Sequence, residues 1–231
     1  SLTHSLTHPT DLLLAIGMGL FAAGPYQAAW HRPASVAPTW LRTLPALLSV
    51  TLTLALLTFF SQYLHPLAEP WTIMQTPKYP TVPLAVRQEL GAASILVSSA
   101  LLMGSIFFLL RGSSGIPRGG LTLLVGLNAL GMSVFQDQYH LLPGILLAGL
   151  AADGLLWWLR PSALRLSAVR IVAVVIPLLV YGSYFAMVAL QEQLIWSIHL
   201  WGGTLVLASI NGWLLSYAML PAPGPQHRAA I

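Results

Sequence analysis

Imidazole and carboxylate side chains gather in the segments that join the apolar stretches of this chain on one side. Five of the seven histidines and five of the six acidic residues belong to this group. Imidazole and carboxylate bind zinc, copper, iron and manganese, and a methionine adds a soft ligand suited to copper(I). The whole set is His4, His8, Asp11, His65, Glu69, Met74, Glu89, Asp137, His140, Glu192 and His199. The pattern predicts a polar, metal-binding site at one end of a helical bundle.

Two of these histidines occupy positions suited to holding a cofactor. His199 falls inside the last apolar stretch, where an imidazole should face protein, water or a metal rather than lipid. His140 begins the fifth stretch at a similar depth. We expect His140 and His199 to ligate copper or another transition metal, or haem b. The residues expected to complete the site, as ligands or as hydrogen-bonding partners of ligands, are His65, Asp137 and Glu69.

Two other interpretations of the same residues stay open. Polar side chains at helix ends are ordinary interfacial residues, and a histidine within a membrane helix often bonds a neighbouring carbonyl, so the site can lack any cofactor. The histidines can also handle a proton or a substrate. Cysteine is absent, which excludes thiolate metal sites, iron–sulfur clusters and cysteine nucleophiles. The sequence assigns no catalytic residue and leaves open whether the protein is an enzyme.

Two classes of cofactor-binding membrane protein are disfavoured. A cytochrome that carries electrons across a membrane between two haems needs histidine pairs at two depths, and the other side of the bundle offers only His31, which lies beyond its stretch. A retinal protein needs a Schiff-base lysine in its last span, and the only lysine here is Lys78, in a connecting segment.

A second polar group lies within the apolar stretches themselves. Asp153 is about 20 Å deeper than His140 along a helix, and Asn128 and Asn211 add amides in other stretches. A buried carboxylate with amides can form a path for a proton or a small solute. The same side chains can equally form hydrogen bonds between helices, worth roughly 0.6–2 kcal/mol each. Both interpretations stay open on sequence alone.

Composition places these residues in a membrane protein. Apolar residues make up 56% of the 231 residues and charged residues only 7%, against about 25% in soluble domains. We predict one all-α transmembrane domain over residues 1–231, a bundle of seven helices. The expected spans are Asp11–Trp30, Leu44–Gln62, Glu89–Leu110, Gly119–Phe135, Leu141–Leu159, Ile171–Leu190 and Leu194–Leu220. The count is six if the first span, interrupted by Gly24-Pro25, or the short fourth span fails.

The basic residues predict how the bundle is oriented. With seven spans, eight arginines fall in the gaps on one side, and only Lys78 and Arg87 fall on the other. This asymmetry follows the positive-inside rule and places the amino terminus outside the cytoplasm. Residues 61–88 then form an external loop with five prolines, which we expect to lie as an ordered lid over the bundle.

These observations predict a multi-pass protein of a bacterial or archaeal cytoplasmic membrane. Our leading hypothesis is a metal- or haem-binding subunit of a membrane redox complex. One alternative is a non-catalytic structural subunit of a membrane complex, and another is a small-solute or proton transporter that uses Asp153. The expected partners are the lipid bilayer and other membrane subunits, and the scattered basic residues give no sign of nucleic-acid binding.

Overall fold

The computed structural model describes residues 9–30, 40–73, 82–112, 115–135, 137–161, 165–191 and 194–220. Helices account for nearly all of this part of the chain. The α-helices are α1 (Pro9–Trp30), α2 (Trp40–Phe60), α3 (Leu84–Arg111), α4 (Gly120–Ser133), α5 (Leu142–Leu159), α6 (Leu166–Leu190) and α7 (Ile198–Met219), with two short 3₁₀ turns, η2 (Gln62–Leu64) and η3 (Gln138–Leu141). The prediction of an all-helical protein is confirmed.

Five of these helices are long and apolar enough to cross a bilayer, namely α2, α3, α5, α6 and α7. They fit a multi-pass membrane protein, whose natural surroundings are lipid. The fourth expected span forms a helix of only 14 residues, α4, which is about 21 Å long and shorter than the hydrocarbon core. The third span begins five residues earlier than expected, at Leu84, so residues 84–88 belong to α3 rather than to the connecting loop.

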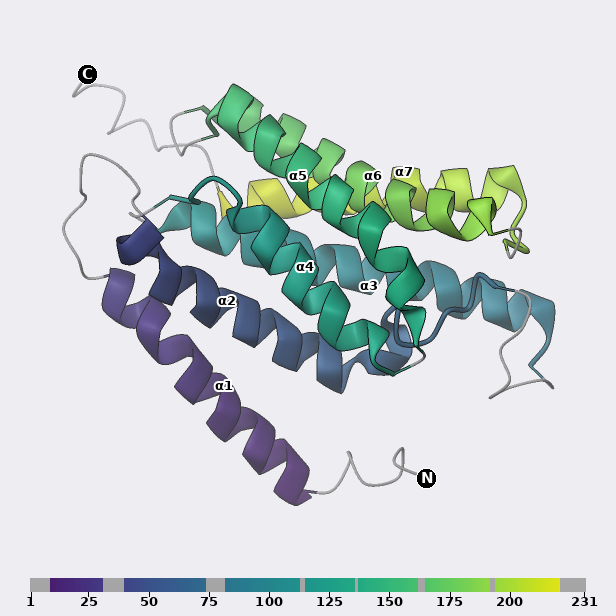
Figure 1. Cartoon of the computed structure of the whole chain (residues 1–231), viewed down its shortest axis with the longest axis horizontal. Coiled ribbons are helices and arrows are strands. Elements are labelled where there is room, and N and C mark those ends of the chain that lie inside the picture. The colour runs from purple at the N-terminus through teal and green to yellow at the C-terminus, as the bar shows by residue number, and fades with distance from the viewer. Residues whose placement is uncertain are drawn as a thin grey trace.

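The long helices pack side by side into one bundle (Figure 1). α3 contacts α2, α6 and α7, whereas α4 packs between α2 and α5. α6 contacts both α5 and α7. The core that they enclose is apolar, with side chains such as Ile95, Phe107 and Leu124 fully buried. α1 packs along α2, and its first turns diverge from the bundle (Figure 1).

The proline in α1 does not end that helix. Proline lacks an N–H and disturbs the backbone bonds of the preceding turn, so such a helix needs polar groups from a neighbour. Ser49 of α2 supplies them: its hydroxyl donates to the Ala22 carbonyl and accepts from the Tyr26 N–H, the latter at 3.3 Å. The helix therefore continues through Pro25 to Trp30.

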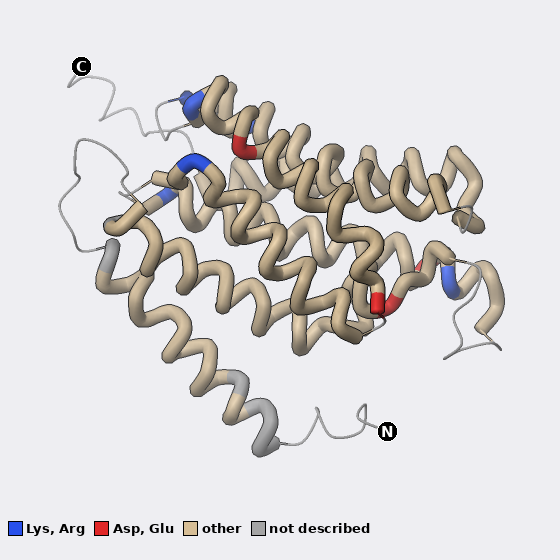
Figure 2. Tube along the Cα trace, in the orientation of Figure 1, with Lys and Arg blue, Asp and Glu red and all other residues tan. Residues whose placement is uncertain are grey.

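The two ends of the bundle differ in charge (Figure 2). Arginines gather where α3 and α5 end and where α4 and α6 begin, and we call this the arginine-rich end. The residues there are Arg111, Arg118, Arg160, Arg165 and Arg170. The opposite end, which we call the arginine-poor end, carries Glu69, Arg87, Glu89 and Asp137. The uneven distribution of basic residues along the sequence thus corresponds to a difference in charge between the two ends of the bundle.

Candidate functional site

The segment after α2 turns into the bundle instead of lying over it. Residues 65–73 are all buried, including Glu69, which is 4% exposed. We call residues 61–73 the plug segment. The expected lid is therefore ordered over this part, but it is inserted between the helices at the arginine-poor end. The remainder of the proline-rich loop, residues 74–81, lies outside the described residues.

Hydrogen bonds hold the plug segment to three helices or their connections. Ser98 of α3 donates to the Leu64 carbonyl at 3.0 Å. The Thr72 and Tyr184 hydroxyls share a hydrogen bond of 2.6 Å, and the Tyr184 hydroxyl also lies 3.3 Å from the Pro66 carbonyl. The Ile195 N–H, just before α7, donates to the Thr72 carbonyl at 3.1 Å. Backbone groups of this irregular segment are thus satisfied by protein, as their burial requires.

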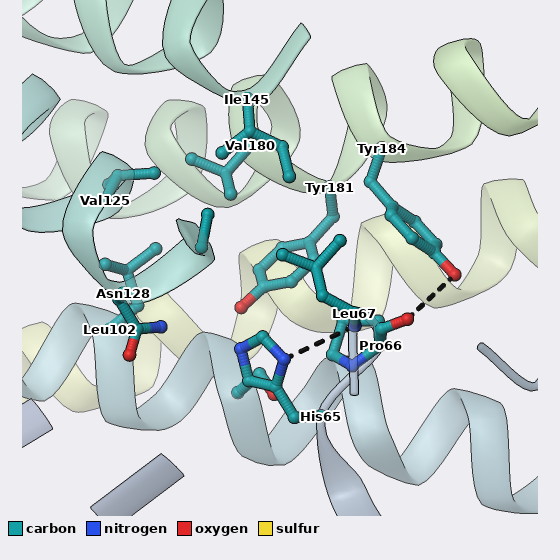
Figure 3. A pocket seen from close by; sticks show the side chains of 12 residues that line it. His65, Pro66, Leu67, Leu102, Val125, Asn128, Ile145, Val180, Tyr181 and Tyr184 are labelled. Carbon is teal, nitrogen blue, oxygen red and sulfur yellow. Dashed lines mark hydrogen bonds between the residues drawn. The ribbon is translucent and has the colours of Figure 1, made fainter. Parts of the chain in front are cut away.

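Beneath the plug segment lies a cavity of about 40 Å³, enough for roughly one to three water molecules. Its polar lining comes from His65 of the plug segment, Ser98 of α3, Asn128 of α4, and Tyr181 and Tyr184 of α6. Apolar side chains of α3, α4, α5 and α6 complete the wall. Figure 3 shows the His65 ring, the Tyr181 hydroxyl and the Asn128 amide turned toward this space.

His65 is a neutral hydrogen-bond donor in this cavity. Its Nδ1 accepts the Leu67 N–H at 3.3 Å, so the proton of the neutral ring resides on Nε2, the nitrogen that faces the other lining residues (Figure 3). The side chain is 5% exposed. Burial lowers the pKa of His65 to about 3, because desolvation penalises the charged imidazolium. The ring is therefore uncharged at physiological pH.

The other polar groups of the lining are also uncharged, and some of their hydrogen-bonding atoms already have partners in the protein. Thr58 of α2 donates to Asn128 Oδ1 at 2.7 Å, which leaves the amide NH₂ for the cavity. The Ser98 hydroxyl donates its proton to the Leu64 carbonyl. The Tyr181 hydroxyl lines the cavity and offers an oxygen lone pair. Together the cavity presents N–H donors from His65 and Asn128 and an acceptor from Tyr181.

The two histidines expected to ligate a cofactor lie elsewhere, with exposed side chains. α7 begins at Ile198, so His199 is in its first turn, nearer the end of the span than the sequence suggested. His140 is in η3, next to exposed Asp137. α5, which follows His140, and α7, which carries His199, both pack against α6. Their ligation of copper, another transition metal or haem b stays a prediction.

The remaining expected ligands are not assembled around a common point. Among the residues that the structure describes, no three His, Asp or Glu side chains come close enough to hold a metal ion. His65 lines the cavity and Glu69 is buried farther along the plug segment, while Glu89 is exposed on α3. The positions outside the described residues are His4, His8, Met74, Lys78, Glu192, His31 and His227, and the side chain of Asp11 is likewise not described.

The intramembrane polar residues form separate hydrogen bonds between helices. Asp153 of α5 accepts the backbone N–H groups of Leu121 and Thr122 at 3.1 and 2.8 Å, and the Thr122 hydroxyl at 2.5 Å. Asn211 of α7 donates to the Leu96 carbonyl at 2.9 Å and to Ser99 at 3.2 Å. Asn128 of α4 accepts a hydrogen bond from Thr58 of α2 at 2.7 Å and also lines the cavity. Three different helix pairs are joined, and these residues do not form one continuous path in the described bundle.

Three lining residues were absent from the sequence prediction. Ser98, Tyr181 and Tyr184 are neutral, and the sequence gave weight only to ionisable and amide groups. The sequence does contain a pattern that points to them, because Ser98-Ser99 and Tyr181-Gly-Ser-Tyr184 interrupt two otherwise apolar stretches. Polar side chains spaced three apart on one helix lie on the same face.

No known family model, no curated protein and no solved structure matches this chain.

Proposed function

We propose that this protein is a small-solute transporter of the membrane whose binding site is the cavity around His65. One observation carries the proposal: a small cavity with N–H donors and an acceptor on its wall lies among helices that are apolar enough to span a bilayer. Such a site is costly in an apolar bundle unless its groups find partners. A bound solute supplies them.

The chemistry of the lining favours an uncharged, polar solute of a few heavy atoms. Among the described residues, the lining contains no carboxylate, lysine or arginine, and His65 is neutral. An ion would enter without a counter-charge, which a low-dielectric site penalises strongly. A neutral molecule that accepts hydrogen bonds from His65 and Asn128 pays no such penalty. The sequence alternative was a transporter that uses Asp153. We place the proposed binding site at the His65 cavity instead, because the Asp153 carboxylate already accepts hydrogen bonds from α4.

The seven-span topology with an external amino terminus is part of this proposal. Under it, the plug segment separates the cavity from the extracytoplasmic solution, and the arginine-rich end faces the cytoplasm. Redox-subunit and structural-subunit roles remain predictions of the sequence. The former is tested by metal analysis and by a Soret absorption measurement on the purified protein.

Flux through proteoliposomes tests the transporter proposal. Shrinkage or swelling after rapid mixing is followed by light scattering for water, ammonia, urea, formamide and glycerol as probes. We expect the protein to accelerate equilibration of at least one of these solutes over empty liposomes. His65→Phe should abolish the acceleration, because the phenyl ring removes the donor and fills the cavity. His65→Gln should retain part of it, because the amide restores a donor.

The matched control is His199→Phe, the same substitution at an exposed histidine, which should leave the flux unchanged. Gel filtration and thermal unfolding confirm that each variant is folded. If no probe moves faster than through protein-free liposomes, or if His65→Phe transports as fast as the wild type, the His65 cavity is not a transport site.

A further inference from the structure

A long apolar groove lies on the lipid-facing side of α4 and α5. It has a volume of about 450 Å³ and an almost wholly apolar lining. Leu142, Leu146 and Leu150 of α5 follow one another at four-residue spacing and so form one side of the groove. Gly126 of α4 has no side chain, and the Leu146 side chain packs closely against it. Leu146 and Leu150 are 41% and 56% exposed.

The groove points toward basic residues at the arginine-rich end. Trp157 lies seven residues beyond Leu150, two helical turns on the same face of α5. Gly154, between them, meets no neighbour within 4 Å at its Cβ position, so no side chain blocks the way. The guanidinium of Arg118, which precedes α4, lies over the Trp157 ring at 5.4 Å. The groove and the aromatic–cation pair thus share one surface.

A second hollow, of about 330 Å³, adjoins Trp157. Trp157, Trp158, Arg160 and Arg165 line it, and Trp157 and Trp158 are 58% and 78% exposed. Arg160 follows the end of α5 with φ = 46°, a left-handed conformation that helices usually give to glycine. Arg160 thus occupies a backbone conformation that glycine would adopt with less strain. Tryptophan and arginine together suit the headgroup level of a bilayer.

The nearest acidic residue along α5 does not compete for these cations. Both oxygens of Asp153 accept hydrogen bonds from Leu121 and Thr122. The carboxylate is therefore directed at the first turn of α4. The guanidinium groups beside Trp157 are left to pair with an external anion.

We propose that the α4–α5 groove binds one acyl chain of an anionic phospholipid, whose phosphate is held by Arg118 and Arg160. The distance from Leu146 to Trp157 along α5 is about 16 Å, close to the depth of one leaflet of a ~30 Å hydrocarbon core. Guanidinium groups pair with phosphate bidentately and without deprotonating. Basic pockets between membrane helices are an established way of recognising anionic lipid headgroups. The inference is independent of the solute site, which is lined by different residues of α4 and α5.

Native mass spectrometry of the detergent-purified full chain tests this proposal. Delipidated protein is titrated with phosphatidylglycerol or with phosphatidylcholine of the same acyl chains. The first lipid should bind at lower concentrations for phosphatidylglycerol. Arg118→Gln and Arg160→Gln should each weaken this first binding about fivefold, as expected for one basic residue near a lipid surface.

Arg170→Gln is the matched control, because Arg170 carries the same charge at the same end but lies over Tyr217 of α7, at 4.1 Å. It should bind phosphatidylglycerol as the wild type does. Equal affinity of the wild type for the two lipids would overturn the proposal, and this readout needs no variant. So would an undiminished affinity of the Arg118→Gln, Arg160→Gln double variant, or an equal loss in Arg170→Gln.

Discussion

Burial decides what the central histidine of this protein can do. In water an imidazole titrates near neutral pH and serves as a proton carrier. At His65 the surrounding plug segment and helices remove water from the ring, so the neutral form is retained. The Leu67 N–H occupies Nδ1 and directs the remaining proton into the cavity. His65 is thus suited to donating a hydrogen bond to a solute rather than to relaying protons.

The same burial makes the stability of the protein depend on pH. The pKa of His65 is about 3 in the folded protein and about 6.5 when unfolded, so the unfolded chain binds the extra proton between these values. The stability is fully present above pH 6.5 and is lost as the pH falls toward 3. We expect the free energy of unfolding of the wild type to fall by up to ~1.4 kcal/mol per pH unit more than that of His65→Gln.

Unfolding titrations with sodium dodecyl sulfate in mild detergent, from pH 7.5 to 4.5, measure this difference. His199→Gln provides the control, because its imidazole is exposed and its removal should leave the wild-type pH dependence in place. Parallel curves for His65→Gln and the wild type would contradict the assignment of His65 as a buried neutral group.

Among the helices, α4 is the one whose length needs an explanation. Its first N–H groups have no partners within the helix, and a 14-residue helix brings them toward the interior of the bundle. Asp153, six residues before the end of α5, accepts two of them. The carboxylate also stabilises the positive end of the helix dipole. A neighbouring helix therefore supplies the cap that the sequence before Gly120 lacks.

Neutralising the Asp153 carboxylate should destabilise the start of α4. We expect Asp153→Asn to lower the free energy of unfolding by about 1–2 kcal/mol, since an amide has one acceptor oxygen and no charge. Denaturation in detergent measures the change. Asp137→Asn is the matched control: Asp137 is exposed with φ = 53°, a conformation that asparagine tolerates, so its loss should be within about 0.5 kcal/mol. Equal losses in the two variants would show that the Asp153 contacts contribute no stability.

At the scale of the whole molecule, the bundle has two chemically distinct ends. The native chain has no cysteine, so single cysteines report the compartment of each end without further changes. We expect Asp137→Cys and Ser197→Cys, both at exposed positions of the arginine-poor end, to react with an impermeant maleimide from the extracytoplasmic side. Arg165→Cys, before α6, should react only after the membrane is permeabilised.

Labelling of residues 137 and 197 from opposite sides would rule out the proposed topology. If both react from outside while Arg165→Cys also does, α6 does not cross the bilayer. The experiment depends on exposure rather than on activity, and it therefore tests the positive-inside orientation independently of the transport assay.

The bounds of the helices followed from the sequence with small errors. α5 differs from its expected span by a single residue, because a long apolar stretch with few charges can satisfy its backbone in lipid only as a helix. The largest errors are five residues each: α3 begins at Leu84 rather than Glu89, and α6 begins at Leu166 rather than Ile171. Polar residues near these two positions hid a first helical turn beyond the apolar stretch.

The site was predicted only in part. The sequence picked out His65 and Asn128 but joined His65 to His140 and His199, which are exposed in the described structure. Assigning a residue to one end of the bundle does not determine the direction of its side chain. That direction depends on helix rotation and on the path of the plug segment, which proline content alone does not reveal.

The sequence by itself determined that this chain is helical with stretches apolar enough to cross a membrane, where its helices run, and that its basic residues gather at one end. These properties depend on local hydropathy and charge, which each stretch carries irrespective of its neighbours. Only the tertiary structure decided that residues 65–73 enter the bundle, that Asp153 caps α4, and that His65, Asn128 and Tyr181 share a cavity. Such contacts join residues far apart in the chain, and packing alone brings them together.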